Sequence, residues 1–155
     1  MGVFCIRLLG TYVEQHLKDI AEGRATPNLS IVYNDMHGLW GGVTITLSTS
    51  GAYERLERAR GAIVPELVQR TVTIDQVQSV VRVLLETRAW EQQALQRRPI
   101  PDEVLATLTL KSGDAESSIW ELYNNLEKNG RLIRVRKLLL DLAAVTPPIE
   151  KTPTR

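Results

Sequence analysis

The chain has little of several things that would mark a particular activity. Its 155 residues hold one cysteine, which excludes an internal disulfide and any zinc or iron–sulfur site built from several cysteines. No apolar run approaches the roughly 18 residues that a membrane crossing needs. Nineteen Lys and Arg against eighteen Asp and Glu leave a net charge of +1, and aromatic residues make up 5%. Because nucleic-acid binders need a cationic surface or a stacking platform, we expect neither nucleic acid nor membrane as a partner.

The composition that remains is that of an ordinary soluble domain. The chain is 43% hydrophobic and 24% charged, and its length suits one domain with its own core. The first charge, Arg7, lies inside the apolar N-terminal stretch, which does not fit a secretory signal. We therefore expect a cytoplasmic protein with a single domain over residues 1–146. The proline-rich residues 147–155 are expected to form a disordered tail.

An amphipathic helix is predicted over residues 1–23. Its apolar residues recur at spacings of three and four, and Gly23 is a typical helix end. The apolar face has three interpretations: packing on the domain's own core, contact with a partner helix in a homodimer, or contact with a membrane surface. The residues of this face are Val3, Ile6, Leu9, Val13, Leu17 and Ile20.

The middle of the chain predicts strands. Residues 29–33 are rich in β-formers, and 43–48 alternate strictly between aliphatic and hydroxyl side chains, so the aliphatic set should face the core. Residues 52–57 can return antiparallel after a turn at Gly51. Residues 59–70 look irregular. A helix over 74–88 should follow, because Thr73 and Gln76 form a capping box.

The last third predicts one further strand over 104–112 and a helix over 132–142. Residues 117–125 fit either a strand or a short helix, and the strand is favoured because the sheet needs a partner there. The fold class is therefore α+β. We expect an antiparallel sheet of four to five strands with helices packed on one face, in the order helix, three strands, helix, two strands, helix.

Known catalytic motifs are missing. The sequence has no phosphate-binding loop, no dinucleotide fingerprint and no nucleophile elbow, and its two histidines leave few ways to build a serine triad. Asp35 and His37 are two residues apart and could share a metal or a proton, with Asp102 and Glu103 as candidate further ligands. A catalytic zinc usually needs three protein ligands, so the simpler interpretation is a turn aspartate and a solvent-facing histidine. We expect no metal, no cofactor and no catalytic residue.

The loop over residues 34–42 is the best candidate for a binding site. It combines three glycines with Asp35, His37 and Trp40 between two strands. Loops carry function more often than the scaffold that holds them. Trp40 either packs into the core or stands out as a binding anchor, and the sequence allows both. Asp35, His37 and Trp40 are therefore the candidate binding residues.

One resemblance accompanies these observations. Residues 38–56 (GLWGGVTITLSTSGAYERL) show a glycine-rich entry, an alternating strand and a turn glycine, followed by a capped helix and another hairpin. Over residues 29–145 this ordering resembles small bacterial domains of the emfourin type, which inhibit thermolysin-like metalloproteases. The resemblance implies an inhibitor-like role and assigns no residue a part in it.

Together these features predict a non-enzymatic binding domain with a protein partner. The inhibitor-like role is what the resemblance alone implies. The alternative is a small hydrolase or transferase with a site near the 34–42 loop. An enzyme would place titratable groups in a concave pocket there, whereas a binding domain would present a convex tip.

Overall fold

A computed structural model describes the backbone of residues 2–24 and 28–144, and the side chains of residues 12–24 and 28–144. The expected tail at 147–155 lies outside these residues. The elements in chain order are α1 (Gly2–Ala21), β1 (Leu29–Asn34), β2 (Gly42–Ser48), β3 (Ala52–Arg58), β4 (Glu66–Thr71), α2 (Ile74–Thr87), β5 (Leu105–Ser112), β6 (Ala115–Leu122), the 3₁₀ helix η1 (Tyr123–Lys128) and α3 (Gly130–Ala144).

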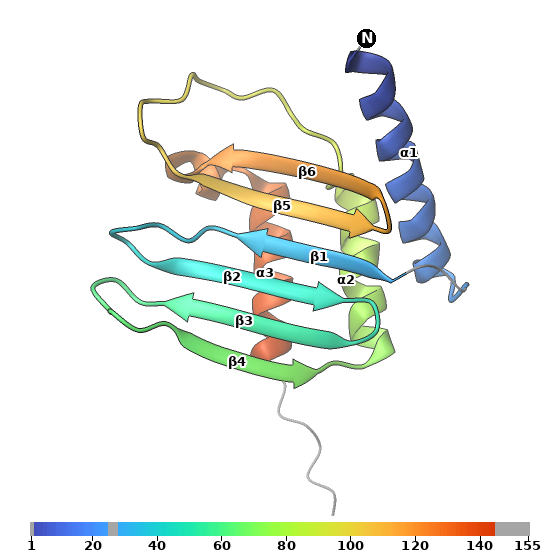
Figure 1. Cartoon of the computed structure of the whole chain (residues 1–155), viewed down its shortest axis with the longest axis horizontal. Helices are drawn as coiled ribbons and strands as arrows, with labels where there is room; N and C mark the ends of the chain where they lie inside the picture. Colours follow the sequence, from blue (N-terminus) through green and yellow to red (C-terminus); the bar gives the residue numbers. More distant parts are fainter. Residues whose placement is uncertain (1, 25–27, 145–155) are drawn as a thin grey trace, which may run out of the picture.

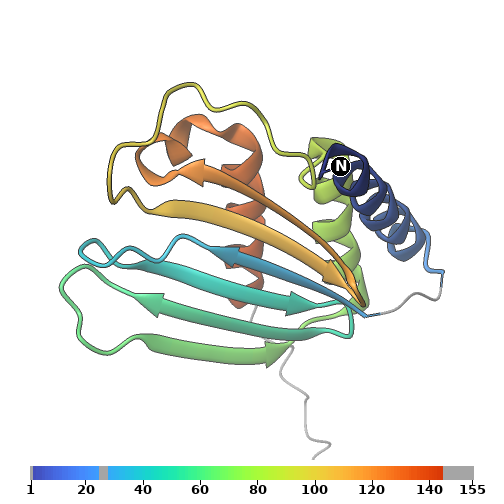
Figure 2. The same ribbon diagram turned by 45° about the horizontal axis from the view of Figure 1, so that its top comes forward.

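The six strands form one open antiparallel sheet in the order β4-β3-β2-β1-β5-β6. Figure 1 shows α2 and α3 behind the sheet, with α1 to one side, and Figure 2 shows the opposite face without a helix. The α+β class and the placement of helices on one face are confirmed. The sheet thus has a helix-covered face and an open face.

The expected strand count and order were wrong, because all of β4 except its last residue lies within residues 59–70, which were interpreted as irregular. This strand pairs with β3 along its whole length, from Ala52 opposite Thr71 to Glu57 opposite Glu66. Sequence periodicity could not reveal it, since an edge strand buries neither face deeply and no side chain of β4 is fully buried. The chain therefore runs helix, four strands, helix, two strands, 3₁₀ helix and helix.

The other strand and helix predictions hold. In β2, Val43, Ile45 and Leu47 are at most 1% exposed, while the intervening hydroxyl side chains are partly exposed on the open face. The ambiguous residues 117–125 divide between the strand β6 and the start of η1. At α2 the expected capping box is present: the Gln76 amide donates to Thr73 Oγ1, and the Thr73 amide donates to Gln76 Oε1.

One hydrophobic core joins the sheet to all three helices. The described part of α1 contributes Val13, Leu17 and Ile20, which are buried against α2, β5 and β6. This part of the apolar face therefore packs on the chain's own core. Val3, Ile6 and Leu9 fall outside the described side chains. Within the described ranges, none of the helices combines the length and apolar character that crossing a membrane requires.

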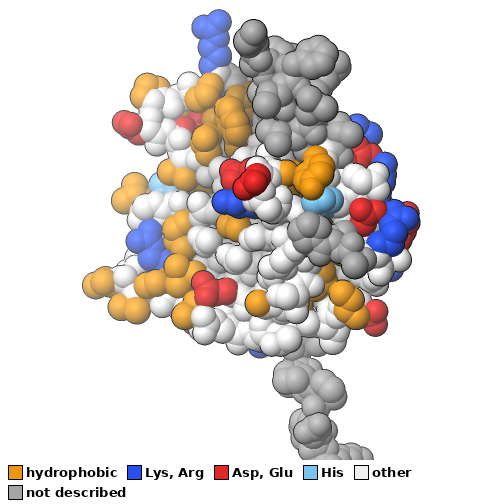
Figure 3. Space-filling model, turned by 45° about the vertical axis from the view of Figure 1, so that its right-hand side comes forward, with side chains coloured by type: hydrophobic (Ala, Val, Ile, Leu, Met, Phe, Trp, Pro, Cys, Tyr) orange, Lys and Arg blue, Asp and Glu red, His pale blue; other side chains and the backbone are white. Residues whose placement is uncertain are grey.

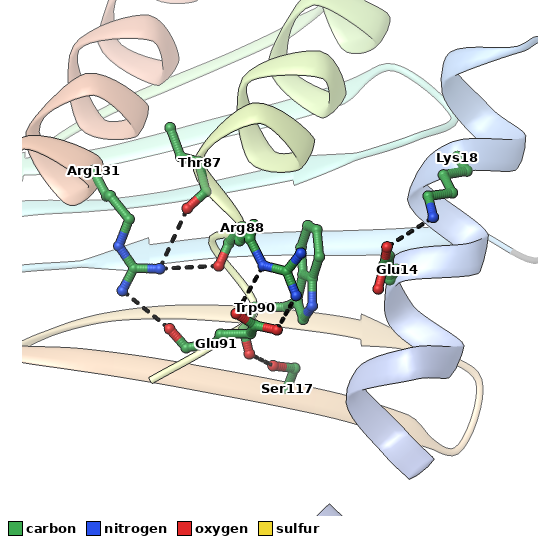
Figure 4. A network of polar contacts seen from close by, with 8 residues as sticks. All are labelled: Glu14, Lys18, Thr87, Arg88, Trp90, Glu91, Ser117 and Arg131. Atoms are coloured by element: carbon green, nitrogen blue, oxygen red, sulfur yellow. Dashed lines mark hydrogen bonds and ion pairs between the residues drawn. The ribbon is translucent and has the colours of Figure 1, made fainter. Parts of the chain in front are cut away.

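The C-terminal end of α2 is held by an arginine from α3. Arg131 donates to the carbonyl oxygens of Thr87, Arg88 and Glu91, at 3.4, 2.9 and 3.0 Å (Figure 4). Arg88, in the left-handed region with φ 49°, closes the helix and pairs with Glu91. Because the last carbonyls of a helix lack partners within it, this guanidinium satisfies groups that would otherwise lie unpaired.

Candidate functional site

The loop between β1 and β2 is fixed at its base by a buried carboxylate. Asp35 is 2% exposed, and its Oδ1 accepts a 2.7 Å hydrogen bond from the Val43 amide. Its Oδ2 accepts from the Tyr33 hydroxyl at 3.0 Å and from Arg136 Nε of α3 at 2.7 Å. The carboxylate therefore ties the start of the loop to β2 and to the helix layer.

The sequence left two interpretations of Asp35, a turn aspartate and a residue that could share a metal or a proton with His37. Both of its oxygens are used within the chain, so Asp35 positions the loop rather than facing a ligand. Burial and the neighbouring carboxylate raise the pKa of the Tyr33 phenol far above its ordinary value, so this hydroxyl remains a donor. Sequence reasoning could not find Arg136, which lies 101 residues away.

Two glycines let the loop fold closely against its neighbours. Gly41 has φ +77°, and a Cβ there would lie 2.0 Å from the Arg58 carbonyl oxygen. Gly42 has φ +140°, and a Cβ there would meet the Asp35 carbonyl oxygen at 2.5 Å. Arg58 also donates through Nη2 to the carbonyl oxygens of His37 and Gly38, at 2.6 and 2.8 Å. The loop is therefore packed against the end of β3.

The His37 side chain stabilises the turn through hydrogen bonds to the backbone of the same loop. Its Nδ1 accepts hydrogen bonds from the Leu39 and Trp40 amides at 3.0 and 3.3 Å. The ring lies 5.0 Å from that of Tyr123 in η1 and 6.4 Å from that of Trp40. His37 thus shapes the turn that presents Trp40.

Trp40 stands out from the core. It is 47% exposed, and the Arg60 guanidinium lies over its ring at 4.0 Å from the centroid. A guanidinium over an indole face is a favourable cation–π contact, and it holds the ring in one orientation. The structure thus decides between the two interpretations of Trp40 in favour of an exposed side chain.

A second loop brings further apolar side chains to the same end of the sheet. Ile63 and Val64, between β3 and β4, are 94% and 78% exposed, and Leu39 beside Trp40 is 75% exposed. We call Leu39, Trp40, Ile63 and Val64 the tip surface. In Figure 3 hydrophobic side chains project at the left-hand margin, on the side where these loops end in Figure 1.

Sequence reasoning missed the second half of the tip surface. The signal was the apolar run Ala62-Ile63-Val64 before Pro65, within a segment interpreted only as irregular. An apolar run in a loop between paired strands has no core to enter, and so it must lie at the surface. The hairpin register of β3 and β4 was needed to recognise it.

The groups considered for catalysis do not come together. Among the described residues, no hydrogen bond or ion pair joins Asp102 to Asp35 or His37, and no cluster of three or more His, Cys, Asp or Glu side chains could hold a metal. Asp102 lies in an exposed loop with φ 62°. A broad hollow of about 530 Å³ on the open face has Glu54 as its carboxylate, which accepts from Gln69 Nε2 at 2.8 Å.

A buried serine and histidine lie far from this loop. His16 Nδ1 is 2.7 Å from Ser112 Oγ, but the two residues are 7% and 1% exposed. The Tyr12 ring covers His16 at 4.2 Å. A nucleophile must reach its substrate, so this pair serves to join α1 to β5.

Four arginines in the second half of the chain are engaged in contacts within the chain. Arg134 pairs with Glu86 at 2.6 Å, Arg136 pairs with Asp35, and Arg97 forms a two-pronged contact with Glu103. Arg131 holds the end of α2, as described above. These contacts tie elements of the fold together, which is a structural role for the basic residues.

Comparison with known proteins adds no relative. The sequence matches no family model, and a search of curated proteins finds no match. The function must therefore be argued from the tip surface and its surroundings.

Proposed function

We propose that the protein is a non-enzymatic binding domain that recognises another protein through the tip surface. The observation that carries the proposal is the exposed Trp40, which contacts Arg60 and lies at the same end of the sheet as three exposed aliphatic side chains from two loops. Tryptophan and arginine are the residue types most enriched at the centres of protein interfaces. A cytoplasmic location is part of the same proposal.

The way the tip is built supports recognition rather than catalysis. Asp35 and His37 form hydrogen bonds that hold the loop, and the exposed side chains of the tip surface are apolar. A preformed loop loses little conformational entropy on binding, so contact area at Trp40 can contribute directly to affinity. The alternative of a hydrolase or transferase would need accessible titratable groups at this end.

The emfourin resemblance suggests one class of partner, a thermolysin-like metalloprotease. The corresponding proposal is that the tip surface enters or covers the cleft of such an enzyme. Inhibition of thermolysin by the wild-type chain, weakened in Trp40→Ala, would support this partner class. Equal hydrolysis rates with and without the wild-type chain would reject it and leave the tip to another protein.

Site-specific photocross-linking in the cells that make the protein tests the proposal itself. A photoreactive residue at Leu39 sits on the tip surface, and the matched control is one at Ile74, which is 60% exposed at the start of α2. We expect a discrete cross-linked protein from position 39 and none from position 74. Adding Trp40→Ala should remove most of the product.

Two results would contradict the proposal. One is a cross-linked band of equal strength from positions 39 and 74, which would mean non-specific contact. The other is a position-39 product unchanged by Trp40→Ala, which would mean that the indole contributes nothing to recognition.

A further inference from the structure

The two edges of the sheet differ in how they are covered. At β6 the side chain of Gln92 takes the place of a neighbouring strand: Nε2 donates to the Trp120 carbonyl at 3.0 Å, and Oε1 accepts from the Trp120 amide at 2.8 Å. Ser117 Oγ also donates to the Trp90 carbonyl at 2.7 Å. The segment after α2, which arches past β6 in Figure 1, thus protects this edge.

The other edge is β4, which has β3 as its only neighbouring strand. Among the described residues, no contact to its backbone resembles that of Gln92 at β6, and the side chain of Gln69 bonds to Glu54 of β3. The Val72 amide donates to the Gly51 carbonyl, and hydrogen-bonded pairs alternate along an antiparallel ladder. It follows that the backbone groups of Leu67, Gln69 and Thr71 point away from β3. An uncovered row of amides and carbonyls is a template for another strand.

We propose that β4 pairs with β4 of a second copy, antiparallel about a two-fold axis at Val68. In this register Glu66 lies opposite Arg70 of the second copy, on the helix-covered face, and the same pair recurs on the other side of the axis. Between these two charged pairs, Val68 lies opposite Val68 of the second copy. On the open face Leu67 lies opposite Gln69, and these two residues exchange the hydrogen bonds between the strands.

Charge selects this register over its neighbour. Opposite charges directly across a strand pair are favourable, and like charges are unfavourable. An axis at Gln69 would also align the outward backbone groups, but it would put Val68 opposite Arg70 and Glu66 opposite Val72. Only the axis at Val68 places Glu66 and Arg70 of the two copies directly opposite each other.

The geometry of the pair makes it independent of the tip surface. The loop of residues 59–65 precedes β4, so an antiparallel pair sends the two tip surfaces to opposite ends of a continuous sheet. A contact of five residues per copy buries less than the roughly 1,200–2,000 Å² of a standard interface. The dimer should therefore be weak and should form as the protein concentration rises.

A charge exchange tests the register. Glu66→Arg and Arg70→Glu each place like charges opposite each other twice, and the double variant restores opposite charges with their places exchanged. Sedimentation velocity over a wide concentration range should show a dimer for the wild type, a shift towards monomer for each single variant and recovery in the double variant. A double variant as monomeric as the single variants would overturn the proposal, as would a wild type that stays monomeric.

A backbone test addresses the strand pairing itself. Gln69→Pro removes an outward amide, whereas Gln69→Ala keeps it, and both lose the hydrogen bond to Glu54. Far-UV circular dichroism should show that both variants fold. We expect Gln69→Ala to dimerise like the wild type and Gln69→Pro to be monomeric. If the two variants dimerise equally, the copies meet at another surface, such as α1, and the proposal is wrong.

Discussion

Replacing Asp35 by alanine should be one of the most damaging single changes in the chain, although Asp35 lies at the root of an exposed loop. The change removes the acceptor for the Val43 amide, the Tyr33 hydroxyl and Arg136 Nε at once. A buried donor left without an acceptor costs about 1–3 kcal/mol. The Arg136 side chain is 34% exposed, so water can replace part of the lost contact there.

We therefore expect Asp35→Ala to lower the free energy of unfolding by about 3–5 kcal/mol. Asp35→Asn should cost less, about 1.5–3 kcal/mol, because its carbonyl oxygen can still accept from Val43 while the charged contact to Arg136 is lost. Combining Asp35→Ala with Arg136→Met should cost less than the sum of the two single changes, since both remove the same ion pair.

Urea unfolding followed by far-UV circular dichroism gives these values, provided that the dependence of the free energy on urea is unchanged. A loss below about 1 kcal/mol for Asp35→Ala would refute the reasoning, because it would mean that the three donors find other acceptors. Strict additivity in the double variant would separately show that Asp35 and Arg136 do not interact.

Three further outcomes follow from the same contacts. Leu84→Ala should cost about 2–5 kcal/mol in urea melts, because Leu84 is fully buried on the core face of α2; an unchanged midpoint would show that this face is not packed. The contact with Arg97 and the Ile100 amide lowers the pKa of Glu103 to about 2 from 4.5, so its contribution to stability is present above pH 4.5 and is lost as the pH falls towards 2. Glu103→Gln should therefore make the free energy of unfolding depend less on pH between 4.5 and 2. If this pH dependence is the same in the variant and the wild type, the contact with Arg97 does not stabilise the ionised Glu103. His37→Ala should leave the metal content of the purified protein unchanged by elemental analysis, whereas stoichiometric zinc lost with this change would reveal a metal site.

The parts of the fold that could be predicted are those in which buried residues recur at a regular spacing. Buried side chains alternate with partly exposed ones in β2, and α2 is a capped helix with one buried face, so each sequence indicates a core on one side. By contrast, β4 pairs with β3 along its whole length but buries no side chain deeply, so its sequence carries no burial pattern that periodicity could detect. The strand was found only through its register with β3.

The site shows a similar division. The loop of residues 34–42 could be selected from its glycines and its polar and aromatic side chains, but not the roles within it. Asp35 is a positioning residue because its carboxylate bonds to Arg136, which is distant in the sequence. Trp40 is exposed because the loop closes against β3 and Arg60 holds its ring. Both facts depend on tertiary contacts that local sequence does not encode.

The central claim is that Trp40 serves recognition and not the stability of the fold. The most direct measurement compares Trp40→Ala with the wild type in thermal unfolding and in photocross-linking from position 39, on the same preparations. We predict a nearly unchanged melting temperature together with the loss of most of the cross-linked product. Replacing an aromatic residue of the core by alanine typically lowers the free energy of unfolding by about 3–5 kcal/mol. A fall of that size in Trp40→Ala would contradict the account, because the loss of binding would then follow from unfolding.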